Sequence, residues 1–320
     1  MPTSHNLIEE FHDMKGENIM RKVRIVFVAS LLFLVAFTSS VSAATKSGVV
    51  YTALGDSIAN GTGGTDGIGY TDLFYDHLVK IYGASEFKDL AQDGLSSAGL
   101  LEMLTVPSDV YGYRAAISQS DYITISIGGN DLLIPFMQEF LLVMFLYYYD
   151  SEISFLDFEG LLEDLEAWQS EPTNPEYAYF GEMLTNLSYV TFPDAITAFA
   201  SNWAQIIGAI RTINPSSTIY VNTGYNPFVN IPLLQVWVDP FVQAVNAVIM
   251  NETLVQMYGY EVVDVYSAFS DYANPNKLEV GDLSCLAQFI MYPDTVPVPL
   301  HPTDLGYKFI FNLHKDLLGE

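Results

Sequence analysis

Cysteine is almost absent from this chain of 320 residues, in which Cys285 is the only one. A single cysteine cannot form an internal disulfide, so the stability of the fold must come from a packed core. Half of the residues are hydrophobic and 14% are aromatic. This is enough apolar material for a sizeable core in one or two domains.

Basic residues are scarce as well, with 12 Lys and Arg against 38 Asp and Glu and a net charge of −26. A polyanion repels the phosphate backbone of nucleic acids and anionic membrane surfaces. We therefore expect neither of them as a partner, and we interpret the charge as a means of solubility in an extracellular setting.

No stretch near the N-terminus is long enough to cross a membrane, although one is strongly apolar. Residues 25–37 are mostly apolar, but this stretch is much shorter than the roughly 20 residues of a membrane span. The basic run Arg21–Arg24 precedes it, and the small residues Val41-Ser42-Ala43 follow it. This order is typical of a secretory signal peptide. We expect residues 1–43 to be removed, leaving a secreted protein without a stable membrane span; an uncleaved anchor is the alternative.

Residues 1–19 fit no part of such a signal, whereas Met20 is a natural start. The run Met14–Glu17 back-translates readily into a purine-rich, ribosome-binding stretch. We hypothesise that residues 1–19 are a leader from a misassigned start codon, which a natural peptide mapped within them would disprove.

Histidine is the third scarce residue, and only three lie beyond residue 43. His77 and His314 fall among apolar residues with helical spacing, which predicts packed core histidines. His301 lies instead in a loop bounded by prolines. Because the pKa of histidine lies near neutrality, His301 is the candidate general base.

Five short apolar runs alternate with segments of helical periodicity, which predicts strands at 49–54, 87–91, 122–127, 218–222 and 261–265. The clearest helices are predicted at 71–82, 98–104 and 195–213. Strands that alternate with helices form a parallel sheet covered on both faces, a three-layer α/β/α fold. Ligands of such folds bind at the carboxyl ends of the strands.

Three polar motifs follow the first three predicted strands: Gly55-Asp56-Ser57, Gly94, and Gly128-Gly129-Asn130-Asp131. A serine hydroxyl becomes a nucleophile when a neighbouring base takes its proton. The oxyanion that then forms needs hydrogen-bond donors placed in advance. The backbone N–H groups of Ser57 and Gly94 and the amide of Asn130 could supply them. The sequence predicts a serine hydrolase that works through an acyl-enzyme.

These motifs resemble those of the GDSL, or SGNH, hydrolase superfamily of esterases and lipases, from about Val49 to Leu317. The resemblance implies that Ser57 is the nucleophile and that Gly94 and Asn130 are oxyanion donors. It also implies that His301, which Pro302 and Gly306 follow in the sequence, is the base. It implies a three-layer sandwich with a five-stranded, flavodoxin-like parallel sheet and no required cofactor or metal.

The sequence departs from the family at one position. An aspartate usually lies three residues before the histidine, where it orients the ring. Here that residue is Val298. Two alternatives stay open: the backbone carbonyl of Val298 accepts from the ring, as in a Ser-His dyad, or Asp294 reaches back to it. Asp304 is expected to cap the final helix.

The predicted mature domain, residues 44–320, contains an aromatic-rich insertion at about 135–194. It forms either an extra helical layer with its own small core or a wall lining an acyl-binding groove. The expected substrate is a small-molecule or lipid ester. Two alternatives are a carbohydrate O-acetylesterase and a non-catalytic cell-surface or binding protein with a disarmed site.

Overall fold

The computed structural model describes residues 48–149, 178–229, 232–274, 277–278 and 300–319, with a few positions between 163 and 174. The predicted signal peptide lies outside the described residues. So do Cys285, Asp294 and Val298.

Five parallel strands form a single sheet in the order β2-β1-β3-β4-β5. The strands are β1 (Val50–Gly55), β2 (Glu86–Ala91), β3 (Tyr122–Ser126), β4 (Thr218–Asn222) and β5 (Glu261–Val263). Gly55 pairs with Ser126, and Ile125 pairs with Val221. The carboxyl ends of the three central strands therefore meet at one edge of the sheet, as the sequence predicts.

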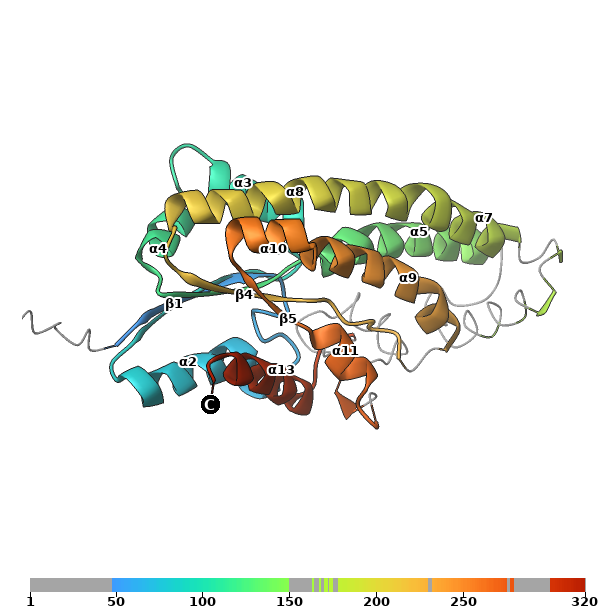
Figure 1. The fold of residues 1–320 in the computed structure, drawn as a ribbon. Coiled ribbons are helices and arrows are strands. Elements are labelled where there is room, and N and C mark those ends of the chain that lie inside the picture. The colour runs from blue at the N-terminus through green and yellow to red at the C-terminus, as the bar shows by residue number, and fades with distance from the viewer. Residues whose placement is uncertain are drawn as a thin grey trace, which may run out of the picture. The chain divides into compact units, whose positions relative to one another are not determined.

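Helices cover both faces of this sheet (Figure 1). One face carries α2 (Tyr70–Tyr82), α11 (Val265–Ser270) and α13 (Asp304–Leu317). The other carries α3 (Ser97–Thr105), α4 (Tyr113–Gln119), α5 (Gly129–Tyr149), α7 (Ala178–Asn186), the π-helical turn η3 (Leu187–Thr191), α8 (Phe192–Ile213), α9 (Pro232–Ile249) and α10 (Glu252–Tyr258). A short 3-10 turn, η1 (Thr65–Gly67), lies between β1 and α2.

Strand residues alternate between two hydrophobic clusters, which explains the two layers of helices. Ala53 packs with α2 and α13, while the next residue, Leu54, packs with α3 and α8. Tyr220 and Val221 divide in the same way. Successive side chains of a strand point to opposite faces, so strands that are apolar on both faces need helices on both.

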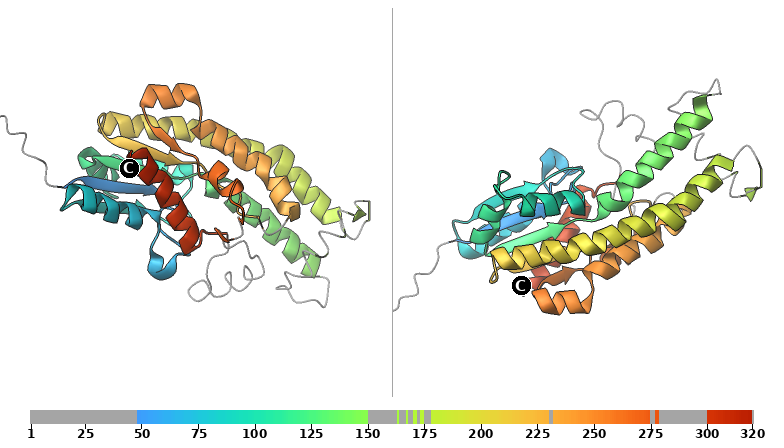
Figure 2. Two further views of the ribbon diagram at one scale, coloured as in Figure 1. Left: turned by 60° about the horizontal axis from the view of Figure 1, so that its bottom comes forward. Right: turned by 90° about the horizontal axis from the view of Figure 1, so that it is seen from above.

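Helices α5, α8 and α9 lie side by side and extend beyond the carboxyl ends of the strands (Figure 2). Phe136 and Phe192 come from the predicted insertion, and both belong to the same continuous cluster as Leu54 and Ile125. The two described ends of the insertion therefore pack in the main core, whereas most of residues 150–177 lie outside the described residues, so a separate small core there stays a prediction. Apolar side chains of α5 and α8 merge with the main core because the two helices continue directly from it.

The five predicted strands are confirmed, with one difference at the fifth. It ends at Val263 because Asp264 caps α11, its side chain accepting from the Ser267 N–H at 3.0 Å. The predicted cap at Asp304 is wrong: Thr303 caps α13, its hydroxyl accepting from Gly306 N–H at 3.2 Å. No helix among the described residues has the length and apolar character to cross a bilayer.

Candidate active site

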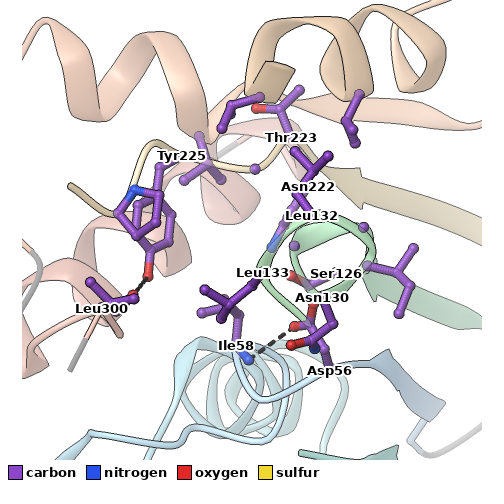
Figure 3. Close-up of a pocket in the computed structure, with 18 of the residues that line it drawn as sticks. Asp56, Ile58, Ser126, Asn130, Leu132, Leu133, Asn222, Thr223, Tyr225 and Leu300 are labelled. Atoms are coloured by element: carbon purple, nitrogen blue, oxygen red, sulfur yellow. Dashed lines mark hydrogen bonds between the residues drawn. The ribbon is translucent and has the colours of Figure 1, made fainter. Parts of the chain in front are cut away.

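Residues from four distant parts of the chain surround one pocket at the carboxyl edge of the sheet (Figure 3). Ser57 follows β1, Asn130 lies in the first turn of α5 after β3, Tyr225 follows β4, and His301 precedes α13. The pocket has a volume of about 120 Å³. The topology explains the convergence, since parallel strands deliver their following loops to the same edge.

Ser57 and His301 form a direct pair in this pocket. His301 Nε2 lies 2.7 Å from Ser57 Oγ, and the His301 side chain is buried. When the neutral ring carries its proton on Nδ1, Nε2 accepts the serine hydroxyl. This is the arrangement by which an imidazole takes the proton of an attacking serine.

The turn after β1 directs Ser57 out of the sheet. A Cβ at Gly55 would lie 1.9 Å from the carbonyl oxygen of Ser126, so only glycine allows β1 to end this close to β3. The Asp56 N–H donates to that carbonyl at 2.9 Å. The Asp56 carboxylate in turn accepts from the Ile58 N–H at 3.0 Å. The backbone on both sides of Ser57 is therefore fixed.

Asp56 is itself an unusual acid because it is buried beside Ser57. Burial raises the pKa of Asp56 to about 7. The negative charge of Asp131 raises this pKa further, while the hydrogen bond from the Ile58 N–H lowers it by part of the total. At mildly acidic pH its carboxyl group is therefore neutral, and no full negative charge lies under Ser57.

The loop that carries His301 contains a strained residue. Leu300 has a φ of +80°, which is unfavourable for a residue with a side chain. The Tyr225 hydroxyl donates to the Leu300 carbonyl at 2.6 Å, a contact drawn as a dashed line in Figure 3. Tyr225 therefore holds the peptide group that immediately precedes His301.

The loop after Ser57 packs directly against His301. A Cβ at Gly63 would lie 2.9 Å from the Cβ of His301, so a glycine is needed for this approach. Two residues of α13 hold the same loop. Asp304 accepts from the Thr65 N–H and hydroxyl, each at 2.7 Å. The Tyr307 hydroxyl donates to the Thr62 carbonyl at 2.6 Å.

These hydrogen bonds from Thr65 hold the pKa of Asp304 below its usual value. Asp304 is therefore ionised at neutral pH, and its function differs from the predicted helix cap. It connects the start of α13 to the loop after Ser57.

Of the three predicted oxyanion donors, Ser57 and Asn130 line the pocket. Asn130 Nδ2 donates to the Leu95 carbonyl at 3.0 Å, which fixes the amide and leaves its second hydrogen for a ligand. The backbone N–H groups of Ser57 and Gly94 have no acceptor among the described residues. Gly94 is exposed and directly precedes Leu95, but it does not line the pocket. Its role as an oxyanion donor stays a prediction.

Asp131, the residue after Asn130, helps to fix the position of Asn130. The Asp131 carboxylate accepts from the Ser97 N–H at 2.9 Å and from the Ser97 hydroxyl at 2.5 Å. Asn202 of α8 donates to that hydroxyl at 2.9 Å. The first turn of α5 is therefore joined to α3 and α8, which fixes the position of Asn130.

The other two histidines lie away from the pocket. His314 is fully buried and stacks on Tyr70 with 4.8 Å between ring centroids, so the prediction of a core histidine is confirmed. Burial lowers the pKa of His314 to about 4. His77 is half-buried and contacts the Phe311 ring edge to face. Within the described ranges no cluster of three or more His, Cys, Asp or Glu side chains could hold a metal ion.

Two residues of the site were not predicted from the sequence, Tyr225 and Leu300. Tyr225 lies three residues beyond β4, at the edge where ligands bind, so its position offers a weak signal. The positive φ of Leu300 leaves no trace in the sequence. Val298 and Asp294 lie outside the described residues, so the group that orients the His301 ring stays open.

A comparison with curated proteins gives a match to only part of a relative's length. The sequence is 35% identical over 99 residues to the uncharacterized protein YpmR of Bacillus subtilis, a match that spans 30% of this chain and 37% of that protein.

Three solved structures share the fold at low sequence identity. A lipase from a goat rumen metagenome has a TM-score of 0.51 at 20% identity, covering 84% of this chain and 96% of its own. An extracellular lipase from Streptomyces rimosus has a TM-score of 0.50 at 17% identity, covering 84% and 99%. A phospholipase A1 from Streptomyces albidoflavus has a TM-score of 0.51 at 16% identity, with the same coverage.

The sequence model of one family matches residues 53–309, a range that contains Ser57, Asn130 and His301. This chain belongs to the GDSL-like lipase/acylhydrolase family.

Proposed function

We propose that the protein hydrolyses carboxylic esters through a covalent acyl-enzyme on Ser57. The observation that carries this proposal is the 2.7 Å contact between Ser57 Oγ and His301 Nε2 inside the pocket at the carboxyl edge of the sheet. A serine in contact with a buried imidazole, beside hydrogen-bond donors without acceptors, has the parts that acyl transfer requires.

In the first half of the reaction Ser57 Oγ attacks the ester carbonyl carbon while its proton passes to His301 Nε2. The carbonyl oxygen becomes an oxyanion, held by the Asn130 amide and the N–H groups of Ser57 and Gly94. The intermediate collapses as the carbon–oxygen bond to the alcohol breaks, and His301 returns the proton to the leaving oxygen. The alcohol departs and the acyl group stays on Ser57.

In the second half a water molecule attacks the acyl-enzyme and gives a proton to His301. The bond to Ser57 Oγ then breaks, and Oγ recovers that proton. The products are the carboxylic acid and the free enzyme. No redox step or external cofactor enters this sequence of proton transfers.

The test is labelling of the purified protein with a fluorophosphonate, followed by peptide mapping and by assays with p-nitrophenyl esters. We expect the label on Ser57, no label in Ser57→Ala, and nearly complete loss of label and turnover in His301→Ala. His77→Ala is the matched control, a histidine outside the pocket whose loss should leave labelling intact. A folded wild-type protein that takes no label would refute the proposal and favour a binding protein with a disarmed site.

We also propose that the protein is secreted after cleavage behind Ala43. The support is the order of the basic, apolar and small-residue segments between Arg21 and Ala43. N-terminal sequencing of the protein from the culture medium should begin at Ala44. Retention of the uncut chain in the cell membrane would show that the segment is an anchor.

A further inference from the structure

An apolar extension of the pocket leads away from Ser57 between helices α5 and α9. Its walls are Leu132, Leu133 and Phe136 on α5 and Val238, Val242 and Val245 on α9. The three valines are four and three residues apart, so they form a single stripe along α9. We call this space the α5–α9 trough.

The length of the trough follows from its two ends. Val245 lies at the inner end, because a Cβ at Gly128, next to the nucleophile site, would be 3.0 Å from its Cγ1. Val238 lies seven residues away on the same stripe, which is about 10 Å along a helix that rises 1.5 Å per residue.

Aromatic rings close the outer end. The Phe136 ring lies against Phe228 with 5.6 Å between centroids, and the Phe192 ring lies against Trp237 at the same distance. Trp237 is fixed by its Nε1, which donates to Ser188 Oγ at 2.9 Å. Because Phe136, Phe192 and Phe228 are each almost fully buried, the end of the trough is a packed wall.

We propose that the α5–α9 trough binds the acyl chain of a medium-chain fatty acyl ester and that Phe136 sets the upper limit of chain length. This inference rests on the proposed ester hydrolysis and specifies its substrate. The trough begins beside the nucleophile, so an acyl group bonded to Ser57 can extend into it, while the alcohol part stays on the open side of the pocket.

The length of the trough gives the length of the chain. Carbon–carbon bonds of about 1.5 Å at about 111° advance an extended chain by about 1.25 Å per carbon, so about 10 Å accommodates about eight carbons. This length points to a chain near octanoyl.

The chemistry of the walls argues against a sugar in this space. All six wall residues are apolar, and a carbohydrate hydroxyl placed among them would lose its hydrogen bonds to water without replacement. An acetyl group would fill only the inner end. A polysaccharide acetylesterase would therefore gain nothing from the remaining length of the trough.

The test is a series of p-nitrophenyl esters from acetate to palmitate, with kcat/KM measured for each. Burial of each methylene is worth roughly a fourfold gain until the trough is full. We expect kcat/KM to rise at least tenfold from acetate to a maximum near octanoate and then to fall. Acetylated xylan is the competing substrate.

Three variants connect the profile to the trough. Val242→Phe places a ring midway along it and should lower the octanoate-to-acetate ratio at least tenfold. Phe136→Ala removes part of the end wall and should move the maximum to longer chains. Phe309→Ala is the control, since it removes an aromatic ring from α13 on the opposite face of the sheet and should leave the profile unchanged.

The outcomes separate this inference from the proposed function. A protein that labels at Ser57 but prefers acetate or acetylated xylan would refute the acyl trough and leave ester hydrolysis standing. The same holds for an octanoate maximum that neither trough variant moves. A protein that takes no label and cleaves no ester would refute both.

Discussion

The hydrogen bond from Tyr225 to the Leu300 carbonyl gives the sharpest test of how His301, the proposed base, is held. Tyr225→Phe removes the hydroxyl and keeps the ring, which packs against Phe269 with 5.0 Å between centroids. The change therefore removes this hydrogen bond without opening a cavity. We expect it to slow the chemistry at Ser57 while the protein stays folded.

The magnitude follows from the strain at Leu300. A left-handed conformation at a residue with a side chain costs about 1–2 kcal/mol. The Tyr225 hydroxyl offsets this cost, and its loss also leaves a buried carbonyl without its partner, which is worth about 1–3 kcal/mol. If the displacement of His301 raises the activation free energy by about 1–2 kcal/mol of this total, the rate falls about five- to thirtyfold.

The measurement is the rate of phosphonylation of Ser57, together with kcat and KM for a short ester. We expect kcat and the labelling rate to fall by the same factor with little change in KM, because the ring still lines the pocket. Tyr260→Phe is the matched control. Its hydroxyl donates to the Ile249 carbonyl, also at 2.6 Å, in the core away from the site. Equal losses in both variants, or full labelling in Tyr225→Phe, would refute a role in positioning His301.

Three further predictions concern the same pocket. Asn130→Ala should lower kcat about a hundred- to a thousandfold in a protein that stays folded but loses the hydrogen bond to the Leu95 carbonyl, and a loss below about tenfold would contradict an oxyanion role. Gly63→Ala should lower the labelling rate more than tenfold, because the new methyl group meets the Cβ of His301; normal labelling would mean that the loop yields.

The third prediction concerns Asp56, whose pKa of about 7 lies above that of an unfolded chain. The folded protein therefore gains stability from the neutral carboxyl at low pH and loses it as the pH rises toward 7. The free energy of unfolding should fall by about 2–3 kcal/mol between pH 5 and pH 8. In urea titrations Asp56→Asn should lack this part of the pH dependence, and parallel curves for the two proteins would contradict it.

The layout of the sheet was predictable because each strand is a short apolar run followed by a turn motif. Residues 218–222 form β4 as predicted, and the three site motifs lie at the strand ends. Parallel topology alone then requires their loops to meet at one edge. The joining of Ser57 to His301 across 244 positions depends on this topology and on no local signal.

Features that depend on packing between distant segments were not predictable. The sequence suggested a wall of an acyl-binding groove within residues 135–194 as one alternative. Apolar periodicity does not show which helix the buried face of α5 meets, so the position of α9 opposite it was not predictable. The same holds for Asp304. Its place beside the start of a helix suggested a cap, whereas its partner, Thr65, is 239 residues away.

The contacts of the His301 loop also bear on the missing family aspartate. The backbone of His301 is fixed by Tyr225, by the close approach of Gly63, and by the hydrogen bonds that α13 makes to the loop after Ser57. A further hydrogen-bond partner of the ring is therefore needed only to set the rotation of the imidazole. A carbonyl in the proline-rich segment before it could do so at no cost in charge. We therefore expect Asp294→Asn to lower kcat less than about tenfold, far from the roughly 10⁴-fold loss known when a catalytic triad loses its acid. A loss above about a thousandfold in a folded variant would assign Asp294 as the orienting acid and exclude the Ser-His dyad.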